Sequence, residues 1–164
     1  MKGNLLAGLI AIDIDPKHLE LAKKYGATHV INSAEEDVEA RIAQITKKHM
    51  ADFVIEGTGI GKVVDQSMNY VRKLGRLIVM SSFKKPADSF DLRVAVAKGI
   101  RIIVAHGSET QADDWRRSVE LINNGTYEIK ELITHEFSLD DINTAFQMLE
   151  NKPQGYIKGL IKFD

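Results

Sequence analysis

The stretch FVIEGTGIGKVVDQ, residues 53–66, reads as a buried strand that enters a glycine turn and continues into a helix. The dinucleotide-binding motif places glycines at relative positions one, three and six. Here the glycines stand at Gly57, Gly59 and Gly61, and Lys62 occupies the position of the third motif glycine. The stretch therefore indicates a strand–turn–helix unit without identifying the pyrophosphate-binding turn.

Strands and helices alternate on both sides of this stretch. The apolar runs predict strands at 9–13, 29–32, 52–56, 76–81 and 100–106, and helices at 16–25, 34–49, 61–73 and 90–98. Because the strands are continuous apolar runs, both faces of the sheet should be covered, as in a parallel sheet with flanking helices. The predicted fold class is α/β and Rossmann-like.

The pattern changes after His106. Helical patterns at 111–125 and 140–151 are joined by a strand-like stretch, and a further strand is predicted near the C-terminus. We therefore expect two domains. Residues 1–106 would form a dinucleotide-binding domain and residues 107–164 a separate C-terminal segment of helices and strands.

Composition excludes several functions. The 22 Lys and Arg residues against 23 Asp and Glu residues leave a net charge of −1, which gives no electrostatic reason to expect nucleic acid or an anionic membrane as partner. The chain has no cysteine, which excludes disulfides and thiolate zinc sites and fits a reducing, cytoplasmic location. The five histidines do not fall at paired helical spacing, so no metal site is predicted.

An acid should follow a dinucleotide turn by about 20 residues, at the end of the next strand, where it binds the ribose hydroxyls. Counted from Gly57 this position falls near Ser81 and Ser82, and neither is acidic. Asp13, in contrast, ends an apolar strand and precedes a helix. We therefore expect Asp13 to close the second strand of the fold. The first strand and its glycine turn would then lie upstream of this chain.

Several segments, in this order and spacing, resemble the C-terminal half of medium-chain zinc-type alcohol dehydrogenases, and they are most similar to the sorbitol, threonine and secondary-alcohol members. The segments are LIAIDIDPKHLELAKKYGATHVINS, DFVIEGTG, LGRLIVMSS and ELITHEFSLDDINTAFQMLENKPQGYIKGLIKF. In the family the segment 107–164 returns to the catalytic domain. The family's zinc ligands and first βα unit have no counterpart in this sequence, so no catalytic residue or metal ligand is assigned.

The resemblance implies roles for residues at the adenosine end of a cofactor. Asp13 matches the acid that chelates the ribose diol, and its charge should repel a 2′-phosphate, so NAD is expected in preference to NADP. His18 falls where relatives place a lysine that reaches toward the same ribose. Gly57, Thr58 and Gly59 match the turn beside the adenine and its ribose, where small residues let a ligand approach the backbone.

The resemblance also implies roles at the other end of the cofactor. Met80, Ser81 and Ser82 match the segment that faces the nicotinamide. Ala105 and His106 match the strand end whose backbone meets the carboxamide, and Lys158 matches the basic residue that contacts the pyrophosphate. As bare sequence, each of these positions also reads as an ordinary strand end or surface residue.

By resemblance the chain is the NAD-binding portion of a dehydrogenase that moves hydride between an alcohol and nicotinamide, with zinc in the full-length protein, and it should be inactive alone. Relatives also form homodimers through the strand at 100–104. A methyltransferase-type nucleotide-binding domain and a non-catalytic fragment or scaffold stay open as alternatives. Without the first strand, residues 9–13 are predicted to pair directly with 52–56, with the C-terminal strand or another copy as the alternative occupant.

Overall fold

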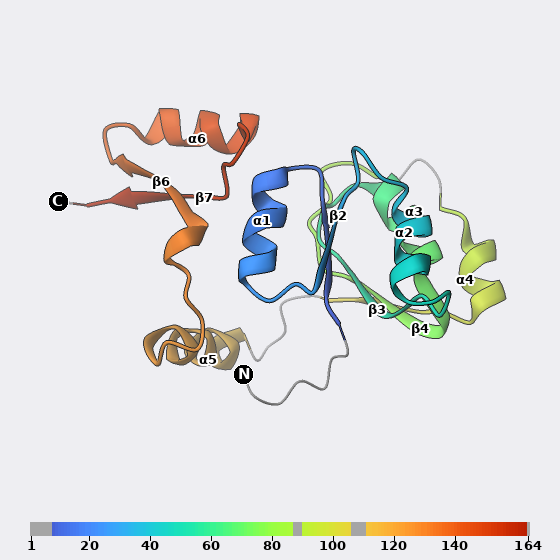
Figure 1. Ribbon diagram of the computed structural model, residues 1–164. Helices are drawn as coiled ribbons and strands as arrows, with labels where there is room; N and C mark the ends of the chain where they lie inside the picture. Colours follow the sequence, from blue (N-terminus) through green and yellow to red (C-terminus); the bar gives the residue numbers. More distant parts are fainter. Residues whose placement is uncertain (1–7, 87–89, 106–110, 164) are drawn as a thin grey trace. The chain divides into compact units, whose positions relative to one another are not determined.

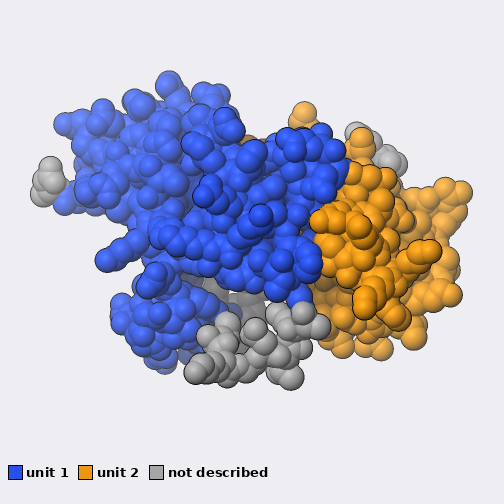
Figure 2. Space-filling model, viewed as in Figure 1, with its two compact units in different colours: residues 1–36, 110–164 blue, residues 37–109 orange. Residues whose placement is uncertain are grey.

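The computed structural model describes residues 8–86, 90–105 and 111–163 (Figure 1). The chain divides into two compact units: unit 1 comprises residues 1–36 and 110–164, and unit 2 comprises residues 37–109 (Figure 2). Strands alternate with helices in both units, and all strand pairs in the described residues are parallel. The α/β fold class with parallel strands is confirmed.

Unit 1 begins with a βαβ unit made of β1 (Ile10–Asp13), α1 (Pro16–Lys24) and β2 (His29–Asn32). Strands β1 and β2 pair in parallel, and the central residue Ile31 is fully buried. Helix α1 begins as its sequence predicts. Asp15 accepts a hydrogen bond from the Lys17 N–H, and Pro16 occupies the first turn, where its missing N–H costs nothing.

The rest of unit 1 comes from the C-terminal part of the chain. Its elements are α5 (Gln111–Asn123), the short 3-10 helix η1 (Lys130–Leu132), β6 (Ile133–Ser138), α6 (Ile142–Asn151) and β7 (Lys158–Lys162). Strands β6 and β7 pair with each other in parallel and form a separate two-stranded sheet. The turn between α6 and β7 reaches α1, and this contact is central to the site described below.

Unit 2 contains a three-stranded parallel sheet in the order β3-β4-β5. Its elements in chain order are α2 (Val38–Ile45), β3 (Ala51–Glu56), α3 (Gly61–Tyr70), β4 (Val71–Val79), α4 (Leu92–Lys98) and β5 (Arg101–Val104). Because the strands are parallel, the carboxyl ends of β3, β4 and β5 share one edge of the sheet. The turns that leave these ends are the ones predicted to contact a cofactor.

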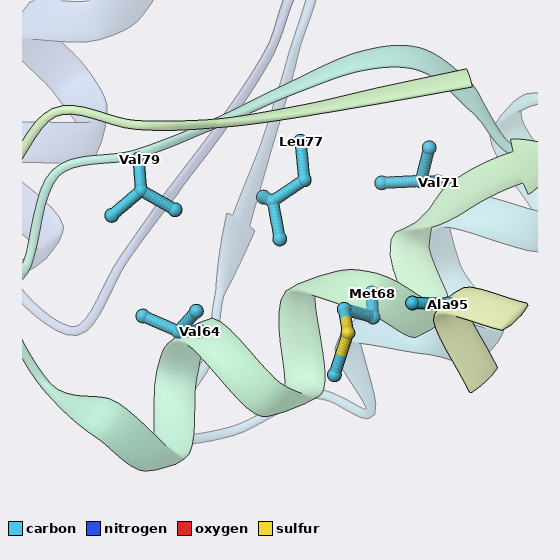
Figure 3. Close-up of a cluster of buried hydrophobic side chains, with 6 residues drawn as sticks. All are labelled: Val64, Met68, Val71, Leu77, Val79 and Ala95. Carbon is cyan, nitrogen blue, oxygen red and sulfur yellow. The ribbon is translucent and has the colours of Figure 1, made fainter. Parts of the chain in front are cut away.

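The core of unit 2 lies between the sheet and helices α3 and α4 (Figure 3). The two helices pack against the sheet, and the strand residues that they bury belong to the central strand β4. The buried cluster consists of Val64, Met68, Val71, Leu77, Val79 and Ala95.

The boundary between α3 and β4 differs from the prediction. The sequence pattern predicts a helix through residue 73 and a strand from residue 76, whereas α3 ends at Tyr70 and β4 begins at Val71. Val71 is fully buried and pairs with Ala51, and the register then shifts before Arg76 pairs with Phe53. Burial of a β-branched residue in the sheet therefore outweighs the helical periodicity of this stretch.

The predicted pairing of residues 9–13 with residues 52–56 would join unit 1 to unit 2, and it stays a prediction. Strand β1 takes its hydrogen-bonded partner from β2, and β3 pairs with β4. The C-terminal strand β7 pairs with β6 and forms a sheet separate from β1 and β2.

Candidate functional site

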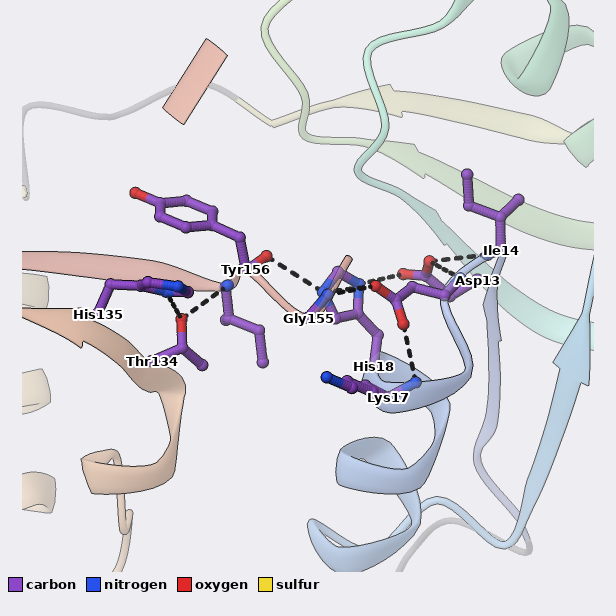
Figure 4. A network of polar contacts seen from close by, with 10 residues as sticks. Asp13, Ile14, Lys17, His18, Thr134, His135, Gly155 and Tyr156 are labelled. Atoms are coloured by element: carbon purple, nitrogen blue, oxygen red, sulfur yellow. Dashed lines mark hydrogen bonds and ion pairs between the residues drawn. The ribbon is translucent and has the colours of Figure 1, made fainter. Parts of the chain in front are cut away.

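The first part of the candidate site lies at the carboxyl end of β1, where Asp13 ends the strand (Figure 4). One carboxylate oxygen, Oδ1, accepts hydrogen bonds from the backbone N–H groups of Ile14 at 2.7 Å and Asp15 at 2.9 Å. These bonds orient the carboxylate, and the side chain is still 39% exposed. Asp13 is therefore a fixed and accessible anion at the position where a ribose-binding acid is expected.

His18 connects this acid to the C-terminal part of unit 1. Its Nδ1 lies 3.3 Å from Asp13 Oδ2, and its Nε2 lies 3.3 Å from the backbone oxygen of Tyr156 (Figure 4). A carboxylate and a carbonyl oxygen only accept hydrogen bonds, so both bonds form together only when both ring nitrogens carry hydrogen. The structure thus brings the predicted residues Asp13 and His18 together, and it adds a link to the turn before β7.

Asp15 forms a second link to the same turn. Its Oδ1 caps α1, and its Oδ2 accepts the Gly155 N–H at 2.8 Å. This hydrogen bond from Gly155 is the main reason that the pKa of Asp15 lies below its usual value, since the bond stabilises the ionised carboxylate. The start of α1 and the turn at residues 153–157 are therefore held together at two points.

Lys158 begins β7 directly after this turn, and it is exposed. Two contacts support the preceding residues. The Ile157 N–H donates to the Thr134 hydroxyl at 3.1 Å, and the Tyr156 ring, which is 7% exposed, packs against the His135 ring with centroids 5.1 Å apart. The position of the Lys158 backbone thus depends on both α1 and β6.

An open surface pocket of about 330 Å³ in unit 1 lies beside the Asp13 carboxylate. Apolar side chains from α1 and from the C-terminal part of the unit form most of its wall, and the acid and the imidazole supply the polar groups. Its lining residues are Asp13, His18, Leu21, Ala22, Tyr25, Leu132 and Ile157.

The second part of the candidate site lies in unit 2, at the turn between β3 and α3. Gly57 is exposed, and a Cβ atom added there would meet no other atom within 4 Å. Gly59 has a φ of +73°, and a Cβ atom added there would come within 2.4 Å of the Ser82 carbonyl oxygen. Gly59 is therefore required both by its backbone conformation and by the close approach of the next turn.

The predicted residues at the ends of β4 and β5 lie at the same edge of the sheet. The Met80 N–H donates to the Glu56 carbonyl at 3.0 Å, and the Ala105 N–H donates to the Val79 carbonyl at 2.9 Å. Met80 is 60% exposed beyond the strand. His106, which was also predicted to contribute, lies outside the described residues.

One residue of this edge was not predicted from the sequence. Glu56, the last residue of β3, is only 2% exposed, and its carboxylate accepts hydrogen bonds from Thr58 and Ser81. The available sequence signal was a charged residue that ends an apolar strand directly before a glycine turn. Such a residue reads as an ordinary strand end, because its partner at position 81 is distant in sequence.

The described residues show neither a metal centre nor a membrane-spanning element. Within residues 8–86, 90–105 and 111–163, no group of three or more His, Cys, Asp or Glu side chains is placed to hold a metal ion. None of the helices in the same ranges has the length and apolar content needed to cross a bilayer.

Comparison with known proteins identifies the family. A family model described as zinc-binding dehydrogenase matches residues 4–124. The chain therefore belongs to the zinc-binding dehydrogenase family, and the resemblance to medium-chain zinc-type alcohol dehydrogenases is confirmed. This membership favours a dehydrogenase origin over the methyltransferase-type alternative.

Individual relatives agree with this assignment. An uncharacterised zinc-type alcohol dehydrogenase-like protein of Escherichia coli K12 is 30% identical over 154 residues, which are 94% of this chain and 43% of that protein. The erythritol/L-threitol dehydrogenase of Mycolicibacterium smegmatis is 31% identical over 153 residues, which are 93% of this chain and 41% of that protein. The chain thus spans well under half the length of these relatives.

Solved structures show the same relationship. The crystal structure of benzyl alcohol dehydrogenase from Acinetobacter calcoaceticus matches with a TM-score of 0.83 and 29% sequence identity. The match covers 96% of this chain and 43% of that protein. The matched portion corresponds to the C-terminal half of such dehydrogenases.

Proposed function

We propose that this chain is the nucleotide-binding portion of an NAD-dependent dehydrogenase that transfers hydride between an alcohol or polyol and nicotinamide. Family membership and the names of the relatives support the oxidoreductase class. The observation that carries the cofactor assignment is the Asp13 carboxylate, which two backbone N–H groups orient at the carboxyl end of a parallel strand. As part of the same proposal, residues 1–106 form the dinucleotide-binding domain and residues 107–164 form the C-terminal segment.

The residues present fit the adenosine end of a dinucleotide. A ribose diol offers two O–H donors, and an oriented, half-exposed carboxylate accepts both. In this proposal Asp13 binds the diol and disfavours a 2′-phosphate by charge repulsion, while His18 holds the carboxylate in place. Lys158 offers a single positive charge to the pyrophosphate.

In unit 2, the proposal assigns the exposed backbone of two turns to the cofactor. The turn at 57–59 would meet the adenine and its ribose, and the segment 80–82, with residues 105 and 106, would meet the nicotinamide end. The nicotinamide, when bound, supplies the hydride acceptor or donor. The residues of this chain contribute binding and orientation.

The family name also implies zinc. The described residues do not fit a zinc site, because no suitable group of side chains is present among them, and we therefore derive no step through the metal. We propose that the chain alone does not turn over substrate, since it spans only 41–43% of the relatives named above.

Calorimetric titration of the purified chain tests the cofactor assignment. We expect NAD to bind more tightly than NADP, and S-adenosylmethionine not to bind. Equal affinity for NAD and NADP would contradict the preference. Failure to bind any nucleotide, together with a cooperative thermal transition, would support the non-catalytic scaffold instead. Zinc-dependent oxidation of secondary alcohols by the chain would contradict the proposed lack of turnover.

We also propose that the chain forms a homodimer through residues 100–104. Strand β5 is the last strand of its sheet, and the side chains of Ile102, Ile103 and Val104 are 36%, 43% and 75% exposed. An apolar edge strand with unpaired backbone groups favours pairing with a second strand. Antiparallel pairing with the same strand of a second copy would complete this edge by two-fold symmetry.

Sedimentation equilibrium at micromolar concentration tests the dimer. We expect the wild-type chain to sediment as a dimer, and the Val104→Lys variant to sediment as a monomer, because a charged side chain on an edge strand opposes pairing. Val104 is the most exposed of the three residues, so the substitution should leave the fold intact. A monomeric wild-type chain would contradict the proposal.

A further inference from the structure

Glu56 is a buried carboxylate to which neither the resemblance nor the proposed function assigns a role. It ends β3, and its side chain is 2% exposed. Burial of a carboxylate is costly unless donors surround it, so the position requires an explanation. The other buried polar residue of the described chain, Ser67, is explained locally, since its hydroxyl donates to the Val63 carbonyl within α3.

The donors around Glu56 come from two different turns. On one side, Oε1 accepts the Thr58 N–H at 2.6 Å and also the Thr58 hydroxyl. On the other side, Oε2 accepts the Ser81 hydroxyl at 2.7 Å. One carboxylate thus joins the turn that follows β3 to the turn that follows β4.

Backbone contacts join the same two turns independently of the carboxylate. The Met80 N–H donates to the Glu56 carbonyl oxygen at 3.0 Å. Gly59 lies so close to the Ser82 carbonyl that a Cβ atom at position 59 would be 2.4 Å from its oxygen. The two turns are therefore packed backbone against backbone, and the carboxylate lies at their junction.

The Thr58 and Ser81 hydroxyl groups are both occupied by this arrangement. The Thr58 hydroxyl donates to Glu56 and accepts from the Ile60 N–H at 3.2 Å, and the Ser81 hydroxyl donates its only hydrogen to Glu56. A ligand at this edge would therefore meet the backbone of the turns and the exposed Ser82 side chain. The relative position of the two backbones would then decide how well the ligand fits.

We propose that Glu56 is a positioning residue that holds the turns at 57–59 and 80–82 in one fixed relative geometry. This inference rests on the proposed function in so far as the ligand is a dinucleotide, whose two halves these turns would contact. Glu56 does not touch the cofactor in this scheme. It acts through the Thr58 backbone and the Ser81 side chain.

Amide hydrogen exchange of the full chain, measured by NMR without cofactor, tests directly whether Glu56 holds the two turns together. We expect Glu56→Ala to accelerate exchange of the Thr58 amide by about 10-fold or more, because this N–H loses its acceptor. Glu56→Gln keeps one acceptor oxygen and should show a smaller acceleration. The matched control Ser67→Ala removes the other buried polar side chain and should leave Thr58 exchange unchanged.

Titration of the same variants with NAD tests the positioning role. We expect the dissociation constant to rise about 10-fold in Glu56→Ala, less in Glu56→Gln, and not at all in Ser67→Ala. Unchanged Thr58 exchange in Glu56→Ala would overturn the inference, as would altered exchange with unchanged NAD affinity. If Glu56→Ala does not fold, Glu56→Gln takes its place with the same criteria.

The experiments distinguish failure of the proposed function from failure of the positioning role of Glu56. If the wild-type chain binds no NAD, the proposed function fails, and the exchange data alone decide whether Glu56 holds the two turns together. If the wild-type chain binds NAD and the variants bind it equally well, the proposed function stands and the positioning role fails.

Discussion

Replacement of Gly59 by Ala should lower the free energy of unfolding of the chain by about 2–5 kcal/mol. The left-handed backbone at this position costs a non-glycine residue about 1–2 kcal/mol, and forcing an extra methyl group into packed structure costs about 1–3 kcal/mol more. The added Cβ would meet the Ser82 carbonyl oxygen at 2.4 Å, and a backbone atom cannot rotate away as a side chain can. Denaturant unfolding measures the change.

Two other glycines provide matched controls. Gly57→Ala, in the same turn, should change stability by less than about 0.5 kcal/mol, because a Cβ atom there has open space and no positive φ to oppose it. Gly125→Ala should show the backbone cost alone, since Gly125 has a φ of +74° and no neighbour within 4 Å. If Gly59→Ala and Gly125→Ala cost the same, contact with Ser82 contributes nothing.

Replacement of Asp13 by Ser should raise the dissociation constant for NAD by roughly 10- to 150-fold. A hydrogen bond to a charged group contributes about 1.5–3 kcal/mol, and this range corresponds to that change in affinity. Loss of the negative charge should also reduce the preference for NAD over NADP, because a 2′-phosphate would no longer face an anion. Parallel calorimetric titrations with both cofactors measure both effects.

Two further variants serve as controls for the role of the Asp13 charge. Asp13→Asn removes the charge but retains an oxygen that can accept hydrogen bonds from the Ile14 and Asp15 N–H groups. This variant should therefore lose the preference for NAD over NADP while it keeps the local fold. Glu20→Ser removes an exposed acid from α1 and should leave both affinities unchanged. Equal NAD affinity of the Asp13→Ser variant and the wild type would exclude Asp13 from the site.

Much of the fold could be predicted from local sequence. The apolar runs predicted the strands, and the parallel pairing followed from their continuous hydrophobicity. The start of α1 followed from Asp15 and Pro16. The end of α3 could not be predicted, because Val71 satisfies helical periodicity equally well and only burial in the sheet decides its state.

The candidate site was predictable only in part. Asp13 could be assigned from its place at the end of a strand, and the structure brings His18 to it. The hydrogen bond from His18 to Tyr156 joins residues 138 positions apart, and no local pattern indicates it. Whether these residues bind a cofactor stays a prediction.

By itself, the sequence determined which segments become strands and helices, and it showed that Asp13 ends a strand. These features could be read locally because periodicity, capping residues and turn glycines act over a few residues. Only the tertiary structure decided which turns meet. The Glu56 carboxylate accepts a hydrogen bond from Ser81, and the Ser82 carbonyl leaves no room for a Cβ atom at position 59. Both contacts arise because parallel pairing of β3 with β4 brings the carboxyl ends of these strands to one edge of the sheet. Such contacts depend on spatial proximity and not on sequence separation, so local patterns cannot specify them.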